Sequence, residues 1–190
     1  MRLRTLVLPL AAAVISGMVW HKLSQNHASD NNGPAERENR SPAPDFEALD
    51  KDNSITRLKT YLGRHNLFVV FFDAEVGAAS DETLQHLKRH SVELATADFH
   101  VIAVSSALPQ QNRGTDFPQE FHLITDPAPI WKIHRAWGCF DDQTERPQQA
   151  VFHIDRAGNV LSENDEPVPL TNPDEQIDAL LGLSHSADSI

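Results

Sequence analysis

The sequence predicts an α/β fold, in which the strands of a central sheet alternate with flanking helices, preceded by an N-terminal hydrophobic helix. Two observations lead to this fold class. Short apolar runs rich in β-branched and aromatic residues alternate with segments of helical periodicity, and turn residues separate them. An uncharged, mostly apolar run, Leu6 to Trp20, precedes this pattern and is followed by polar sequence. With 190 residues, of which 40% are hydrophobic, the chain is long enough for one globular domain with extensions.

Residues 1–23 are expected to be a signal anchor or a signal peptide, because a basic start precedes the apolar run. The run is shorter than the roughly 20 residues that span a bilayer, which favours a signal-peptide core. The best cleavage site ends at Ala28, but Asn26 stands at the third position before the cut, where a small residue is preferred. We therefore expect an uncleaved anchor that places the rest of the chain outside the cytoplasm, on the periplasmic or cell-surface side. If the segment is cleaved, the protein is secreted.

Residues 24–42 are expected to form a disordered polar linker. They are rich in Asn, Ser, Glu, Arg and Pro, and they contain too few large apolar residues to bury a core. The folded domain is expected to span residues 43–183, and residues 184–190 are expected to form a flexible tail.

Three strands are expected in the first part of the domain. Leu67 to Phe72 is a continuous apolar run, typical of a central strand that is covered on both faces. Phe99 to Val104 is expected to be a second central strand. Phe121 to Ile124 is expected to be a shorter one that ends before a turn at Asp126-Pro127.

A helix is expected to begin at Ser80, which suits an N-cap, and to run to about Leu94. Leu84, Leu87 and Leu94, with Val92 alongside, have the spacing of an apolar stripe. This stripe is expected to pack on the sheet.

The last part of the domain is expected to contain a helix, a hairpin and a final helix. The first helix covers Ile130 to Trp137. The hairpin joins Ala150–Ile154 to Asn159–Leu161, with Gly158 at a turn that needs a positive φ. The final helix begins at Pro173, a residue that suits the first helical position.

Charge and cysteine content exclude several classes of function. The formal net charge of −11 argues against binding nucleic acid, because phosphate contacts need clustered positive charge. The single cysteine, Cys139, excludes a disulfide within one chain. No Cys/His spacing matches a structural zinc site, and no cofactor is expected.

Several phrases in the domain resemble those of one protein family, and they occur in that family's order. They are Ala43-Pro44-Asp45-Phe46, Leu67 to Phe72, Val101 to Ser105, Leu123 to Pro127, Ala136-Trp137-Gly138, Arg146-Pro147 and Ala150 to Gly158. The chain thus resembles the redoxin group, which joins thioredoxin-like oxidoreductases to the alkyl hydroperoxide reductase and thiol-specific antioxidant proteins. The resemblance covers about residues 43–183 and implies a thioredoxin-like, peroxiredoxin-type central mixed sheet flanked by helices.

The same resemblance identifies a degenerate active site. It places the two positions of a thioredoxin CxxC pair at Gly77 and Ser80, and the peroxidatic position near Ser80 or Asp81, so that no cysteine stands at any of them. The proline that faces the thiols in thioredoxins is replaced by Gln149, whereas Pro147 fits the peroxiredoxin version better. Without a thiol at the helix start, we expect no thiol redox chemistry there.

Cys139 is open to more than one interpretation. A free cysteine usually packs as a small apolar group, so a semi-buried structural residue is the preferred interpretation. An intermolecular disulfide or a lone reactive thiol is the alternative that an exported protein permits.

His86 and His90 stand four residues apart on the predicted helix, a spacing that can place two imidazoles on one face to bind a metal. Two ligands do not make a site, and a third would have to come from Asp73, Glu75, His65 or His100 through folding. We expect both histidines to face solvent and to bind no metal.

These observations support two hypotheses for function. In the first, the chain is a membrane-tethered redoxin domain that lacks catalytic thiols and acts as a binding or assembly module for an unknown protein partner at the membrane. In the second, it is a thiol-dependent antioxidant oxidoreductase or peroxidase that works through Cys139.

Overall fold

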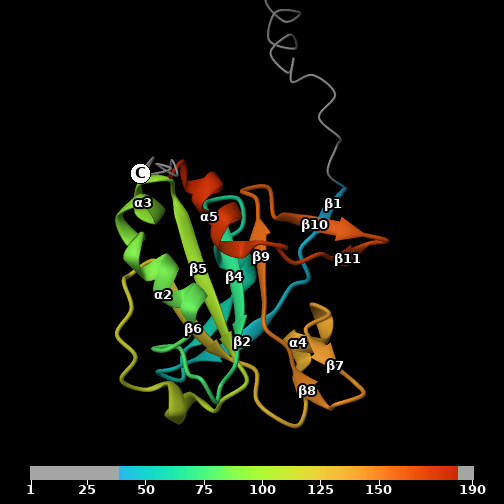
Figure 1. Cartoon of the computed structure of the whole chain (residues 1–190). Helices are drawn as coiled ribbons and strands as arrows, with labels where there is room; N and C mark the ends of the chain where they lie inside the picture. The colour runs from blue at the N-terminus through green and yellow to red at the C-terminus, as the bar shows by residue number, and fades with distance from the viewer. Residues whose placement is uncertain (1–38, 184–190) are drawn as a thin grey trace, which may run out of the picture. The chain divides into compact units, whose positions relative to one another are not determined.

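The computed structural model describes residues 39–183, which contain all the elements labelled in Figure 1. The strands are β1 (Arg40–Pro42), β2 (Glu47–Asp50), β3 (Ile55–Arg57), β4 (Asn66–Phe72), β5 (Phe99–Ser105), β6 (Phe121–Thr125), β7 (Phe140–Asp141), β8 (Arg146–Pro147), β9 (Ala150–Ile154), β10 (Asn159–Glu163) and β11 (Glu166–Pro167). The helices are α2 (Glu82–Arg89), α3 (Ser91–Thr96), α4 (Lys132–Ala136) and α5 (Pro173–Leu181), with 3-10 turns η1 (Leu58–Thr60) and η2 (Pro109–Asn112).

The main sheet is mixed. Its strand order is β1-β10-β9-β4-β5-β6-β2-β3, and β11 pairs with β10. The central strands β4, β5 and β6 are parallel, whereas β9 pairs with β4 in the antiparallel sense. This arrangement confirms the predicted fold class, a thioredoxin-like mixed sheet flanked by helices.

Alternate residues of β4 enter two separate cores. Phe68, Val70 and Phe72 pack with residues of α2 and α5, which lie in front of the sheet in Figure 1. Leu67, Val69 and Phe71 pack on the opposite face, with residues of α4. Since both faces are covered, every apolar position of this strand is buried, which is why its sequence reads as one continuous run.

The helix predicted from Ser80 to Leu94 is wrong in two respects. Its N-cap is Asp81, whose carboxylate accepts a hydrogen bond from the Leu84 N–H at 2.9 Å. The segment also forms two helices, α2 and α3, because the backbone at His90 leaves helical dihedral angles (φ −102°, ψ 28°).

Val92 does not join the apolar stripe and is 73% exposed. The helical spacing that predicted its burial does not continue through the break between α2 and α3.

The other elements agree with the sequence. The three expected strands correspond to β4, β5 and β6, the hairpin to β9 and β10, and the last helix to α5. Gly158 has a φ of +90°, as its turn was expected to need, and a Cβ there would lie 3.3 Å from a methyl carbon of Leu62. The helix predicted from Ile130 begins later, at Lys132, and is the five-residue α4.

The first strand lies in the segment expected to be linker. Residues 40–42 form β1, which pairs with β10 at the edge of the sheet, because edge pairing needs only backbone groups and no apolar run. The expected anchor at 1–23, the linker up to residue 38 and the tail at 184–190 lie outside the described residues. Among residues 39–183, no helix has the length and apolar character that crossing a bilayer requires.

Candidate binding site at the carboxyl edge of the sheet

The degenerate active-site positions lie where the central strand ends. Residues 73–81 connect β4 to α2 and contain Gly77, Ser80 and Asp81. Because β4, β5 and β6 are parallel, the loops that follow them meet at the same edge of the sheet. In open α/β sheets, ligands bind at this carboxyl edge.

Hydrogen bonds close the loop upon itself. The Asp73 carboxylate accepts from the Glu75 N–H at 2.8 Å, and the Asp73 carbonyl accepts from the Gly77 N–H at 3.0 Å. The Gly77 carbonyl accepts in turn from the N–H groups of Ser80 and Asp81, at 3.0 and 3.1 Å. Gly77 has a φ of +78°, which a residue with a side chain adopts only with strain. The loop is therefore built around Gly77, the residue that the resemblance assigned to the first thiol position.

Asp81 occupies the buried cap position of α2, whereas Ser80 is exposed. Burial raises the pKa of the Asp81 carboxyl, and hydrogen bonds from the backbone of Leu84 and Thr83 oppose this change. Repulsion from other acidic side chains, Glu82 among them, raises this pKa further. The helix start therefore disfavours a second negative charge, such as a thiolate or a bound anion.

Two hollows border the loop. One, of about 190 Å³, lies against the β8–β9 connection and is lined by Asp73, Glu75, Ser106, Arg146, Pro147 and Gln149 among others. The other, of about 280 Å³, is lined by Asp81, Thr83, Gln149, Ala150, Leu170 and Pro173 among others. Pro147 and Gln149, which the resemblance assigned to the position of the proline that faces the thiols, thus lie beside the loop. Gln149 belongs to both hollows.

An exposed apolar side chain follows each of the three parallel strands. Val76, after β4, is 46% exposed; Leu108, after β5, is 52% exposed; and Ile130, after β6, is 70% exposed. The three loops share one edge of the sheet, and we refer to Val76, Leu108 and Ile130 together as the apolar rim of that edge. The sequence contains this signal, one apolar residue in each loop, but only the sheet topology brings the three loops to one edge.

Cys139 is 3% exposed, and its carbonyl accepts a hydrogen bond at 2.8 Å from the N–H of Gln148, in the β8–β9 connection. It packs with Trp137 and Phe152 in the core that α4 covers, whereas Ala78, in the loop, belongs to the core on the other face of the sheet. Burial raises the pKa of the thiol to about 12, and its S–H donates to the Trp137 carbonyl at 3.5 Å. The structure therefore places Cys139 as a packed core residue.

The expectation that His86 faces solvent is wrong. Only 14% of its side chain is exposed, and its Nε2 lies 2.8 Å from Oδ1 of Asp178 on α5. His90 stands beside it, with the two ring centroids 4.9 Å apart. Asp178 is thus the third group near the pair, and none of the four candidates considered from the sequence is. A contact between residues 92 positions apart leaves no local signal in the sequence.

Sequence reasoning also missed a buried acid–histidine pair. Asp126, directly after β6, accepts hydrogen bonds at its Oδ2 from the N–H groups of Ile133 and His134, both at 2.8 Å. The same oxygen lies 2.7 Å from Nδ1 of His134, whose side chain is fully buried. The sequence did place a turn at Asp126-Pro127 and a helix after it, but it gave no sign that the Asp126 side chain caps that helix. The pair fixes the first turn of α4 against the sheet.

The parallel strands β4, β5 and β6, the antiparallel β9, helices on both faces and a loop that opens a helix at the carboxyl edge define a thioredoxin-like domain of peroxiredoxin type. The model of the AhpC/TSA family matches residues 40–162. The chain therefore belongs to the AhpC/TSA family, as its resemblance to the redoxin group implied.

Known proteins agree with this assignment. The chain is 27% identical over 145 residues to alkyl hydroperoxide reductase E of Mycobacterium bovis and of Mycobacterium tuberculosis, covering 75% of this chain and 95% of each relative. Among solved structures, peroxidoxin BcpB from Mycobacterium tuberculosis has a TM-score of 0.55 at 18% identity, with 80% of this chain and 99% of that chain covered. BsSco, a member of the Sco family of cytochrome c oxidase assembly proteins, has a TM-score of 0.53 at 13% identity, with 80% and 100% covered. At these identities the two structures show the fold alone.

Proposed function

We propose that this redoxin domain has lost thiol catalysis and acts as a binding or assembly module, which holds a protein partner at the carboxyl edge of its sheet. One observation carries this proposal. The positions that the resemblance assigns to the thiols are Gly77, Ser80 and Asp81, in a closed loop, while the only cysteine of the chain is buried in the core on the other face of the sheet.

The chemistry of the remaining groups supports the loss of catalysis. A serine hydroxyl at the start of α2 does not supply the thiolate that attacks a peroxide or a disulfide. With a pKa of about 12, Cys139 is ionised to only about one part in 10⁵ at pH 7. Its burial also denies access to a second thiol, so the alternative of a peroxidase working through Cys139 has no support in the geometry.

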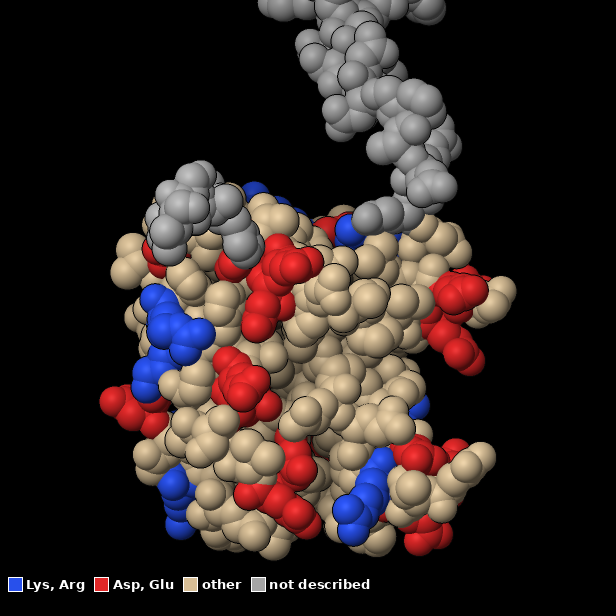
Figure 2. All heavy atoms as spheres, in the orientation of Figure 1, with Lys and Arg blue, Asp and Glu red and all other residues tan. Residues whose placement is uncertain are grey.

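The surface of this edge defines the partner. The apolar rim offers contacts to apolar side chains, and the exposed carboxylates of Asp73 and Glu75 stand beside it in the loop. Acidic side chains are more widespread than basic ones on the face that Figure 2 shows, and the chain carries a net charge of −11. We infer a protein partner that presents apolar anchor residues with basic neighbours.

The proposal includes export and a membrane tether. Its support is the sequence of residues 1–23, where a basic start precedes an uncharged apolar run. Carbonate washing of membranes tests it: the full chain is expected to stay in the membrane fraction, and added protease is expected to digest its domain from the extracytoplasmic side. A domain that stays protected in spheroplasts and is digested only after the cytoplasmic membrane is lysed would contradict export.

Catalysis is tested with the full chain in detergent, given dithiothreitol and either hydrogen peroxide or insulin. The expected result is no thiol-dependent turnover above that of the Cys139→Ser variant. Turnover that the wild type shows and Cys139→Ser loses would overturn the proposal in favour of a peroxidase or oxidoreductase.

The binding edge is tested by placing a photo-crosslinking amino acid at Val76, Leu108 or Ile130 in cells that make the protein. The matched control position is Val92, which is more exposed than Val76 or Leu108 but lies on α3. We expect the same discrete adduct from the rim positions and none from Val92. An adduct of equal yield at Val92, or none at the rim, would contradict the assigned edge.

A further inference from the structure

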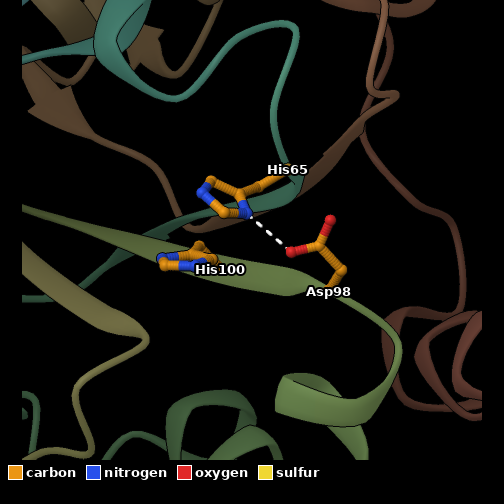
Figure 3. Close-up of side chains that lie close together, drawn as sticks. All are labelled: His65, Asp98 and His100. Carbon is orange, nitrogen blue, oxygen red and sulfur yellow. Dashed lines mark hydrogen bonds and ion pairs between the residues drawn. The ribbon is translucent and has the colours of Figure 1, made fainter.

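A cluster of imidazole and carboxylate groups lies at the edge of the sheet opposite to the binding edge. His65 directly precedes β4, Asp98 directly precedes β5, and His100 is the second residue of β5. Figure 3 shows the His65 ring above the His100 ring, with Asp98 beside both. One potential ligand atom from each residue lies within 4.8 Å of the other two.

The pairing of β4 with β5 creates this cluster. Leu67 pairs with His100 in the parallel register, and the Asn66 N–H donates to the Asp98 carbonyl at 3.1 Å. These contacts bring His65 and Asp98, which are 33 residues apart, to a side-chain hydrogen bond of 2.7 Å. The pairing of two buried strands thus fixes the backbone positions of His65 and Asp98.

We propose that His65, Asp98 and His100 bind a divalent transition-metal ion of the class that prefers imidazole nitrogen, Zn²⁺ or Cu²⁺. Two histidines and one carboxylate are a common donor set for these ions. Three donors at about 2 Å from one ion lie about 3.3 Å from each other, so the observed spacing needs only small side-chain rotations. The ion takes the place of the proton between His65 Nδ1 and Asp98 Oδ1, and the neutral His65 ring then carries its one proton on Nε2.

Neighbouring groups hold the three ligands in place. Arg156 forms an ion pair with Oδ2 of Asp98, which leaves Oδ1 directed at His65. His100 Nδ1 lies 3.1 Å from Nε2 of His122, and the two rings stack with an interplanar angle of 4°. A hydrogen bond at one ring nitrogen orients the other for a metal, as second-shell partners do in known metal sites.

Asp98 supplies the negative charge of the cluster, and the imidazoles supply neutral donors. The hydrogen bond from His65 lowers the pKa of the Asp98 carboxyl, which is therefore ionised at neutral pH. Burial lowers the pKa of His100 and brings that of His122 to about 4, and repulsion from neighbouring histidines lowers both further. The carboxylate of Glu120 opposes these changes. These two imidazoles are neutral at pH 7 and keep a lone pair available for coordination.

A second trio, His86, His90 and Asp178, is less suited to a cation. The guanidinium of Arg89 approaches Nδ1 of His86 to 3.4 Å, which places a positive charge next to a ring that would carry the ion. Arg156 near Asp98 instead contacts the carboxylate oxygen that faces away from His65. The trio on α2 therefore serves as the matched control.

The test uses the full chain with a tag that contains no histidine, solubilised in detergent and titrated at pH 7.5 with Zn²⁺ or Cu²⁺ in competition with a chromogenic chelator. We expect one ion per chain with micromolar or tighter affinity, and no binding of Mg²⁺, which prefers oxygen ligands. The variant H65Q/H100Q is expected to weaken binding at least about 100-fold, whereas H86Q/H90Q leaves it unchanged. Wild-type protein that binds no stoichiometric ion, or H65Q/H100Q that binds as the wild type does, would overturn the proposal.

A second measurement does not depend on the variants folding. The electron paramagnetic resonance spectrum of the wild type with one equivalent of Cu²⁺ is expected to show hyperfine coupling to two or more imidazole nitrogens, lost below about pH 5 as protons compete. A spectrum with only oxygen ligands would contradict the site. The seven residues of β4 separate the cluster from the binding edge by about 20 Å. The result of crosslinking at the apolar rim therefore does not depend on whether the cluster binds a metal ion.

Discussion

Asp126 and His134 form a buried pair in which Oδ2 of the acid lies 2.7 Å from Nδ1 of the imidazole. The same carboxylate oxygen accepts the N–H groups of Ile133 and His134, so a single side chain satisfies three donors at the start of α4. Trp137 and Ile133 of this region pack in the core on that face of the sheet. The pair thus connects the end of β6 to a helix too short to be stable alone.

Removing this carboxylate is expected to destabilise the domain strongly. Asp126→Ala leaves buried donors without an acceptor, and the free energy of unfolding should fall by about 3 kcal/mol. Urea unfolding followed by tryptophan fluorescence measures this. The control is Asp142→Ala, which removes an exposed ion pair with Arg135 and should cost under about 1 kcal/mol. Equal losses of unfolding free energy in the two variants would show that the buried pair stabilises the domain no more than the exposed ion pair does.

The helix cap is expected to depend on Asp81 and not on Ser80. Asp81→Ala should lower the free energy of unfolding by about 1 kcal/mol, while Ser80→Ala, at an exposed position, should change it by a few tenths at most. The reverse order would restore the sequence-based prediction of a Ser80 cap.

The same residue predicts a pH dependence. Since the pKa of Asp81 is raised in the folded state, its protonated form favours folding, and the stability it contributes is present below pH 3.8 and lost as pH rises through the folded pKa. Asp81→Asn keeps a capping side chain without the charge, so it should be at least as stable as the wild type at pH 7. A loss as large as that of Asp81→Ala would contradict this account.

Protonation of His122 is expected to destabilise the domain in mild acid. Its pKa falls from 6.5 to about 4 in the folded state, so the unfolded chain binds more protons between these values, and stability is lost as pH falls from 6.5 towards 4. The decrease in unfolding free energy attributable to this group is up to about 3 kcal/mol. Unfolding at pH 7 and pH 4.5 should show a smaller difference for His122→Gln than for the wild type. The control is His90→Gln, outside the cluster; a pH difference reduced equally in both variants would rule out His122 as its source.

The sequence predicted those parts of the fold that a local pattern determines. The strand from Leu67 is buried on both faces, so its apolar run was readable, and Gly158 marked a turn whose φ only glycine adopts easily. The cap was misplaced by one residue because Ser80 and Asp81 are both good caps, and only the backbone path decides between them. The His65–Asp98 and His86–Asp178 contacts depend on the register of distant elements, which no local pattern encodes.

Cys139 is expected to be unreactive in the folded protein. A rise in the thiol pKa from 9.0 to about 12 lowers the thiolate fraction about 1000-fold at neutral pH, and burial blocks the reagent as well. A chromogenic disulfide reagent should label the native chain only at the rate of unfolding and should label it at once in urea. Rapid labelling of the native state would return the lone reactive thiol to consideration.

A cysteine placed at the start of α2 tests whether this loop activates a thiol. In a Cys139→Ala background, Ser80→Cys is exposed and should react with the same reagent at least about 100-fold faster than Cys139 does in the wild type. Its rate with hydrogen peroxide should nevertheless remain within about tenfold of free cysteine. There are two reasons. The Leu84 N–H already donates to the Asp81 carboxylate and does not stabilise a thiolate, and the negative charge in the first turn of α2 repels one.

Adding Asp81→Asn to Ser80→Cys removes the nearest negative charge while it keeps a capping side chain, so the peroxide rate should rise several-fold over Ser80→Cys alone. Competition kinetics against a reference peroxidase measure both variants. If Ser80→Cys alone reacted with peroxide 100-fold faster than free cysteine, the loop would still provide a peroxidatic environment. The departure from the family's chemistry would then lie in the missing sulfur alone, and the acidic neighbours would have no part in it.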